Sequence, residues 1–145
     1  MNPFPFDARF GIERPLPVRT YDIDFAGTVG NIVFVRGLED LRLLLLQESY
    51  SIARALADDM APILRATRIA YAHPVGMRDE LIGRIWVTEM QHVRWSIAAE
   101  FLVGVRVHAM AEQEGLFPRL STRRPVGIPP ALRARYGAGL TPRSE

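Results

Sequence analysis

The sequence predicts an α+β fold in which a five-stranded antiparallel sheet wraps one long central helix. Two observations predict it: one apolar helical stretch at residues 31–57, and four strand-like stretches after it with no second long helix between them. Strands that follow one another through short turns pair antiparallel, and such a sheet covers its apolar face with the helix. We expect one domain over residues 1–145, with its core at about residues 16–135.

The segment before the helix is predicted to be extended and then to turn sharply. Residues 1–15 are rich in proline, phenylalanine and arginine and are expected to be irregular. Residues 18–24 follow as the first extended stretch, and the turn after them contains Gly27 and Gly30. Either Gly30 or Asn31 is suited to cap the helix that begins here.

The predicted helix has an apolar middle. Residues 43–46 are four consecutive leucines, and at about 100° per residue they occupy most of the helix circumference. Such a segment cannot simply lie on a surface. We therefore expect it to be enclosed on several sides, by a curved sheet or by a partner subunit.

The remaining strands are predicted from alternating, β-branched and aromatic residues. Breaks at Pro74–Gly76, His92 and Gly104 separate them. A short helix at residues 131–136 and an irregular tail at 137–145 follow a proline-rich segment. The four predicted strands are residues 63–71, 81–91, 95–103 and 105–117.

The composition excludes several classes of function. The chain has no cysteine and no lysine, so a thiolate nucleophile, a disulfide framework and a catalytic lysine are impossible. Its net charge is only +2 and no run of basic residues occurs, which disfavours nucleic-acid binding. No secretory signal or apolar run of about 20 residues is present. We expect a soluble, cytoplasmic protein.

Other familiar catalytic patterns are also missing. His73, His92 and His108 are too scattered for a metal motif, so no metal site is predicted. There is no G-x-S-x-G motif of the serine hydrolases and no G-x-G-x-x-G motif of dinucleotide-binding folds.

One contiguous motif points to a family. It runs from the end of the first extended stretch into the helix, and its matching residues are Asp22, Asp24, Gly27, Val29, Asn31, Phe34, Glu39 and Arg42. The motif resembles the signature of the 4-hydroxybenzoyl-CoA thioesterase-like group of hotdog proteins. Weaker matches at Tyr71–Pro74, Arg94–Ser96 and Thr122–Pro125 extend the resemblance over residues 16–135. It implies the hotdog fold and hydrolysis of an acyl or aroyl thioester.

The resemblance implies that Asp24 is the catalytic carboxylate, either as a nucleophile or as a general base. On turn statistics alone, both Asp22 and Asp24 would serve as turn residues. The resemblance assigns the oxyanion site to the backbone amide of Asn31 at the helix start, beside Gly30. The side chain of Asn31 is equally suited to cap the helix. Members of the group commonly carry His at the position of Thr28, so the subfamily stays open.

Glu39 is a second candidate catalytic group, because a related hotdog subfamily uses a carboxylate at about this helical position. The alternative is an ion pair with Arg42 three residues later. Arg94 and Ser96, and more weakly Arg123 or Arg124, are candidates for holding the phosphates of coenzyme A. The expected substrate-binding residues are Phe25, Gly27, Thr28, Phe34, Tyr71, Arg94 and Ser96, with Leu38 in the acyl slot.

Three alternatives remain for the function: an acyl-CoA thioesterase, a thioesterase for carrier-protein substrates of a polyketide or fatty-acid pathway, and a non-catalytic acyl-CoA-binding protein. Coenzyme A is part of the substrate, and no other cofactor is implied. The resemblance also implies a homodimer or homotetramer, because the long strands would otherwise leave an open sheet edge.

Overall fold

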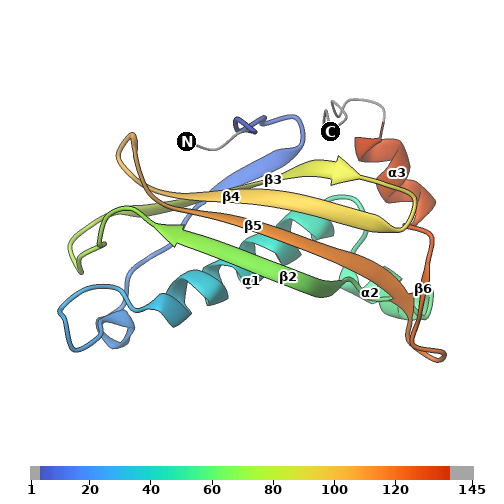
Figure 1. The fold of residues 1–145 in the computed structure, drawn as a ribbon, viewed down its shortest axis with the longest axis horizontal. Coiled ribbons are helices and arrows are strands. Elements are labelled where there is room, and N and C mark those ends of the chain that lie inside the picture. Colours follow the sequence, from blue (N-terminus) through green and yellow to red (C-terminus); the bar gives the residue numbers. More distant parts are fainter. Residues whose placement is uncertain (1–3, 138–145) are drawn as a thin grey trace.

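The computed structural model, which describes residues 4–137, contains a six-stranded antiparallel sheet. The strand order is β1-β3-β4-β5-β2, and β6 pairs with β5 (Figure 1). The strands are β1 Gly11–Pro15, β2 Ile63–Tyr71, β3 Leu81–Met90, β4 Arg94–Val103, β5 Arg106–Arg119 and β6 Arg124–Val126. The helices are η1 Thr20–Asp22, α1 Asn31–Gln47, α2 Ile52–Ala57 and α3 Pro130–Tyr136.

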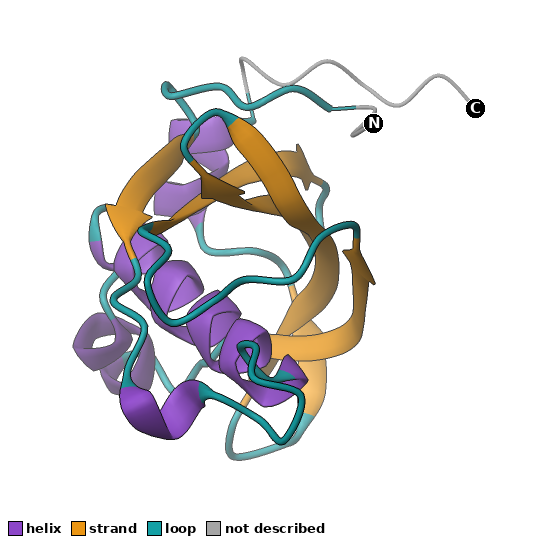
Figure 2. Ribbon diagram, turned by 90° about the vertical axis from the view of Figure 1, so that its left-hand side faces the viewer, coloured by secondary structure: helices purple, strands orange, loops and turns teal. Residues whose placement is uncertain are grey.

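Helix α1 lies along the inner side of the curved sheet (Figure 2). Its Leu38 and Leu41 have no exposed surface, and they pack with Ile85 and Phe101 of the sheet in one hydrophobic core. Gly83 of β3 allows the close approach, because a Cβ there would lie 2.6 Å from Cδ1 of Leu41. The helix therefore sits against the sheet with no room for one more carbon atom at this point.

The predicted helix over residues 31–57 is wrong in length, because the structure divides it into two. α1 ends at Gln47, and α2 begins after Ser51. The backbone of Ser51 is extended and its side chain accepts a hydrogen bond from the N–H of Arg54 at 3.1 Å. Ser51 thus starts a new helix as its N-cap instead of continuing the old one.

The leucine run is only partly enclosed by this chain. Leu45 and Leu46 are buried, whereas Leu44 is 46% exposed. Ile32 and Val35 are also exposed on α1. Residues 4–137 therefore do not enclose the helix on several sides, and cover by a partner subunit stays a prediction.

The first strand differs from the prediction. The stretch at residues 18–24 is not a strand, because η1 interrupts it, with the Asp22 carboxylate accepting from the N–H of Arg19 at 2.8 Å. The strand lies earlier, at Gly11–Pro15, within the segment predicted to be irregular. Pro15 is tolerated there because, in the described part of the chain, β1 pairs with β3 alone and forms an edge of the sheet. With the short strand β6, which the sequence did not predict, the sheet has six strands instead of five.

The last four predicted strands are confirmed as β2 to β5, and the short terminal helix as α3. The predicted irregular tail lies outside the described residues beyond Gly137. Among residues 4–137, no helix combines the length and the apolar character that crossing a membrane requires.

Candidate active site

The turn before α1 holds the carboxylate of Asp24 in a fixed position. Its Oδ1 accepts hydrogen bonds from the backbone N–H groups of Ala26 at 2.9 Å and Thr28 at 3.4 Å. The backbone of Asp24 exchanges two further bonds, donating to the carbonyl of Thr28 and accepting from Gly27. Gly27 adopts a φ of +80°, which favours glycine. Asp24 therefore serves as the turn residue expected from statistics, and its Oδ2 keeps no partner among the described residues.

The same turn presents the start of α1. The N–H of Gly30 donates to the carbonyl of Asp22 at 3.0 Å, so this amide is already used. The N–H of Val33 donates to the carbonyl of Gly30 at 3.1 Å. The N–H of Asn31, the first residue of the helix, donates to no described residue. An unpaired amide at a helix N-terminus carries partial positive charge and can bind a carbonyl or carboxylate oxygen.

These groups open into one pocket of 280 Å³ between the start of α1 and the end of β2. Of the residues predicted for the site, it brings together Asp24, Thr28, Asn31, Phe34 and Tyr71. The rings of Phe34 and Tyr71 meet edge to face, with their centroids 5.3 Å apart. Burial raises the pKa of the Tyr71 hydroxyl. The remaining lining residues are Val29, Ala72, His73, Pro74 and Val75.

Other predicted site residues lie outside this pocket. Phe25 is fully exposed at the tip of the turn, and the space around the Cα of Gly27 is open. Arg94 and Ser96 lie at the start of β4, and Phe101, which touches Phe34, lies seven residues after Arg94 along the same strand. At about 3.3 Å per residue, this separation is roughly 23 Å. Leu38 is wholly buried.

Glu39 forms the ion pair with Arg42 that was the alternative to a catalytic role, with Arg42 Nη2 at 2.5 Å from Glu39 Oε2. The Glu39 side chain is 50% exposed and that of Arg42 is 11% exposed. Arg42 Nη1 also donates to Oε1 of the buried Gln113 at 3.2 Å, and Gln113 Nε2 donates to Thr67 of β2 at 3.1 Å. Glu39 is thus tied to a network that crosses from α1 to the edge of the sheet.

Sequence reasoning missed His73, which lines the pocket with Asp24. Its ring packs against that of His108, with the centroids 5.5 Å apart. Arg106 Nη2 lies 3.1 Å from His73 Nδ1. Burial, and then the charges of Arg106 and His108, lower the pKa of His73. The pairing of β2 with β5 could have revealed this cluster. It aligns Tyr71 with Ala109, so the residues just after Tyr71 lie beside His108.

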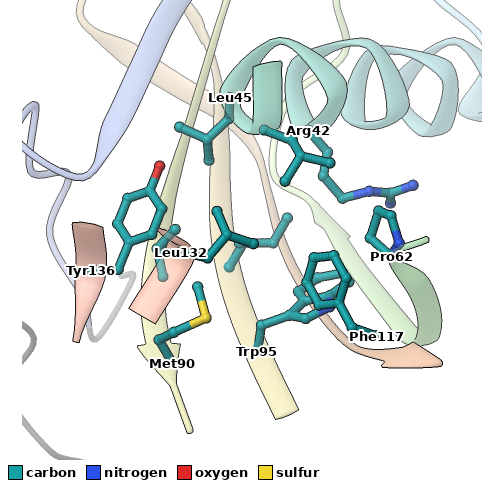
Figure 3. Close-up of a pocket in the computed structure, with 11 residues that line it drawn as sticks. Arg42, Leu45, Pro62, Met90, Trp95, Phe117, Leu132 and Tyr136 are labelled. Carbon is teal, nitrogen blue, oxygen red and sulfur yellow. The ribbon is translucent and has the colours of Figure 1, made fainter. Parts of the chain in front are cut away.

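A second cavity, of 50 Å³, lies at the other end of α1. Figure 3 shows Leu45, Trp95 and Leu132 pointing into it. Its walls are apolar except at Arg42, whose buried Nε has no hydrogen-bond partner among the described residues. The other lining residues are Leu46, Pro62, Val87, Met90, Ile97, Phe117 and Tyr136.

Comparison with known proteins places these features in context. A model of the thioesterase-like superfamily matches residues 18–136. A protein of the thioesterase superfamily from Jannaschia sp. has the same fold, with a TM-score of 0.84 at 15% identity over 98% of this chain and 99% of that one. A probable thioesterase from Escherichia coli gives a TM-score of 0.74 at 20% identity, covering 87% of this chain and 95% of its own.

A 1,4-dihydroxy-2-naphthoyl-CoA thioesterase from Synechocystis also shares the fold. Its TM-score is 0.77 at 20% identity, over 92% of this chain and 98% of that one. A search of curated protein sequences gives no match.

Proposed function

Because the chain belongs to the thioesterase-like superfamily and is a thioester hydrolase with the hotdog fold, we propose that it is an acyl-CoA thioesterase that acts through Asp24. Its products would be the free acid and coenzyme A. The observation that supports this proposal is a single pocket lined by both Asp24 and Asn31. Thioester hydrolysis requires a base or nucleophile and a donor for the oxyanion, and a carboxylate and a helix N-terminal amide can supply these two functions.

The two groups would divide the chemistry between them. The thioester carbonyl oxygen accepts a hydrogen bond from the N–H of Asn31, and the dipole of the 17-residue helix α1 stabilises negative charge there. The amides of Ala26 and Thr28 hold Oδ1 of Asp24, so Oδ2 is the oxygen that reacts. The helix start and the turn thus hold both groups in place before substrate arrives.

Two routes lead from this arrangement to the same products. In the first, Oδ2 of Asp24 attacks the carbonyl carbon, the C–S bond breaks, and water hydrolyses the resulting mixed anhydride. In the second, Oδ2 accepts a proton from a water molecule, which attacks the carbonyl carbon and displaces the thiolate. Both routes consume one water molecule for each thioester.

A homodimer would complete the site. Within residues 4–137, strand β2 pairs only with β5, and most of its residues are exposed, so it leaves an open sheet edge. In a two-fold dimer paired antiparallel through the middle of β2, near Thr67, Tyr71 lies beside the partner's Ile63. Ile63 aligns with Leu116 of β5, which in turn aligns with Arg94 of β4.

This pairing would give a role to Arg94 and Ser96, which lie far from the pocket within one chain. The partner's Arg94 and Ser96 then lie at the same end of the joint sheet as Asp24, where arginine suits the phosphates of coenzyme A. Pro62, which precedes β2, lines the apolar cavity of Figure 3. The partner's cavity would therefore lie next to the catalytic pocket and would receive the far end of the acyl group.

The proposal is tested by measuring hydrolysis of a panel of acyl-CoA and aroyl-CoA substrates with a thiol-reactive dye. Asp24→Asn is expected to lower kcat by about 100-fold or more. Asp22→Asn is the matched control, because the Asp22 carboxylate accepts a hydrogen bond from the N–H of Arg19, just before η1, and Asp22 lines no part of the pocket. Its rate should stay within about threefold of wild type.

Three other outcomes of this assay would contradict the proposal. Equal rates for wild type and Asp24→Asn would remove Asp24 from the mechanism. Hydrolysis of carrier-protein thioesters alone would identify a pathway enzyme. Binding of acyl-CoA without hydrolysis would identify a binding protein.

A further inference from the structure

We propose that His73 donates a hydrogen bond from Nε2 to the carbonyl oxygen of the bound thioester, as a second donor beside the amide of Asn31. His108 and Arg106 act as positioning residues that hold the ring of His73 in this state. The inference rests on the proposed function, because His73 lines the pocket that contains Asp24 and Asn31.

The contact with Arg106 fixes where the proton of His73 lies. Nη2 of Arg106 is 3.1 Å from Nδ1 of His73. A guanidinium only donates hydrogen bonds, so Nδ1 must accept and therefore carries no proton. A neutral imidazole then holds its proton on Nε2. Nε2 has no hydrogen-bond partner among the described residues and is left for a ligand.

His108 fixes the position of the same ring. Its Nδ1 lies 3.0 Å from the carbonyl oxygen of Pro74, which only accepts, so this nitrogen carries the proton of His108. Its ring meets that of His73 at 69°. The carbonyl of His108 also accepts hydrogen bonds from the N–H groups of Ala72 at 2.8 Å and His73 at 3.1 Å. Both the backbone and the ring of His73 are thus held by one residue of β5.

The positive charges around His73 favour its neutral form. Arg106 and His108 face it from β5, whereas the carboxylate of Asp24, which shares the pocket from the turn before α1, has the opposite effect. Burial and the charge of Arg106 keep the pKa of His73 below its usual value. A neutral imidazole N–H is too weak an acid to surrender its proton, so it acts as a fixed hydrogen-bond donor. Fixed donors stabilise an oxyanion more than a neutral carbonyl, which lowers the barrier to reaction.

The tautomer can be read without any assay of activity. Long-range ¹⁵N–¹H spectra of the imidazole rings at pH 7 should show His73 neutral and protonated on Nε2, and His108 protonated on Nδ1. In Arg106→Met, the pKa of His73 should rise. A His73 that is protonated on Nδ1, or on both nitrogens at pH 7, would overturn the inference.

The kinetic test compares three substitutions. His73→Ala should lower kcat by about 10²–10³-fold with little change in KM, because the bond strengthens only in the transition state. His73→Gln keeps a donor near the Nε2 position and should recover at least about tenfold of that loss. The matched control, His92→Ala, removes a histidine that lies outside the pocket and should not change kcat.

The outcomes separate this inference from the proposed function. If Asp24→Asn is inactive while His73→Ala keeps the wild-type kcat, the role of His73 fails and the role of Asp24 stands. If Asp24→Asn keeps its rate, the proposed function fails. If His73→Gln is as slow as His73→Ala and both unfold at the wild-type temperature, a hydrogen bond from Nε2 is not what His73 provides.

Discussion

The two ends of helix α1 differ in chemistry although one continuous helix forms both. At its start, a 280 Å³ pocket combines Asp24 and His73 with the unpaired amide of Asn31. At its end, a 50 Å³ cavity is lined by apolar side chains and a single arginine, Arg42. Under the proposed function, one helix would supply reactivity at one terminus and substrate shape at the other. The four predictions below test this division.

The largest expected difference concerns stability. Leu45→Ala removes a buried side chain at the end of α1 and should lower the free energy of unfolding by about 2–5 kcal/mol. Asp24→Asn, at the start of α1, should change it by no more than about 0.5 kcal/mol, because the amide oxygen can still accept from Ala26 and Thr28. Urea unfolding measures the free energy of unfolding of both variants. Similar decreases in the two variants would contradict the expected difference between the helix ends.

The second expected effect concerns substrate length. Leu132→Phe reduces the apolar cavity and should raise KM about tenfold for acyl-CoA substrates whose chains reach it, while short acyl groups are unaffected. The matched control is Leu56→Phe, because Leu56 is exposed on α2. An equal change in KM for all chain lengths would argue against the cavity as an acyl site.

The third expected effect is a loss of folding stability at alkaline pH, caused by the ionisation of Tyr50 just beyond the end of α1. Burial, and then a hydrogen bond to Asp58, raise the pKa of Tyr50 to about 12. The unfolded chain releases this proton near pH 10, so stabilisation by the neutral phenol is complete below pH 10 and is lost as pH rises from 10 to 12.

Urea unfolding between pH 8 and pH 12 measures this dependence. Tyr50→Phe should be less stable than wild type by about 1 kcal/mol at pH 8 and should lack this part of the alkaline loss. Tyr21→Phe, which alters an exposed tyrosine, should follow wild type throughout. Identical alkaline slopes in Tyr50→Phe and wild type would show that Tyr50 ionises as it does in the unfolded chain.

The smallest expected effect lies at the break between α1 and α2. Ser51→Ala removes the side-chain oxygen that accepts from the N–H of Arg54 and should cost about 1 kcal/mol. Ser51→Thr keeps a hydroxyl and should cost less. Thermal unfolding of the two variants compares them, and a neutral Ser51→Ala would mean that the helix break has another cause.

The features that were predictable from the sequence are local ones. The strands β2 to β5 show their alternation within a few residues, and Asp24 and Asn31 lie in one contiguous motif whose turn brings them together. Strand β1 carries Gly11 and Pro15 and has no such alternation, so only its pairing with β3 makes it a strand.

The missed site residue has a similar explanation. His73 and His108 come together through the register of β2 on β5, which local sequence patterns do not reveal. The break at Ser51 depends on the choice between two local hydrogen-bonding patterns, helix continuation or a new cap. Local propensity does not decide between them, because serine is compatible with both.

Gly83 imposes a limit on how enzymes of this design can diversify. A methyl group there would collide with Leu41 of α1 and with Leu16, so the middle of α1 and the strand β3 beneath it act as a spacer of fixed thickness. Mutations that enlarge or shrink the substrate space can accumulate only beyond that spacer, towards the two helix termini. If the apolar cavity holds the acyl group as proposed, a library that aims to change the acyl preference would leave Gly83 untouched and randomise the walls of that cavity.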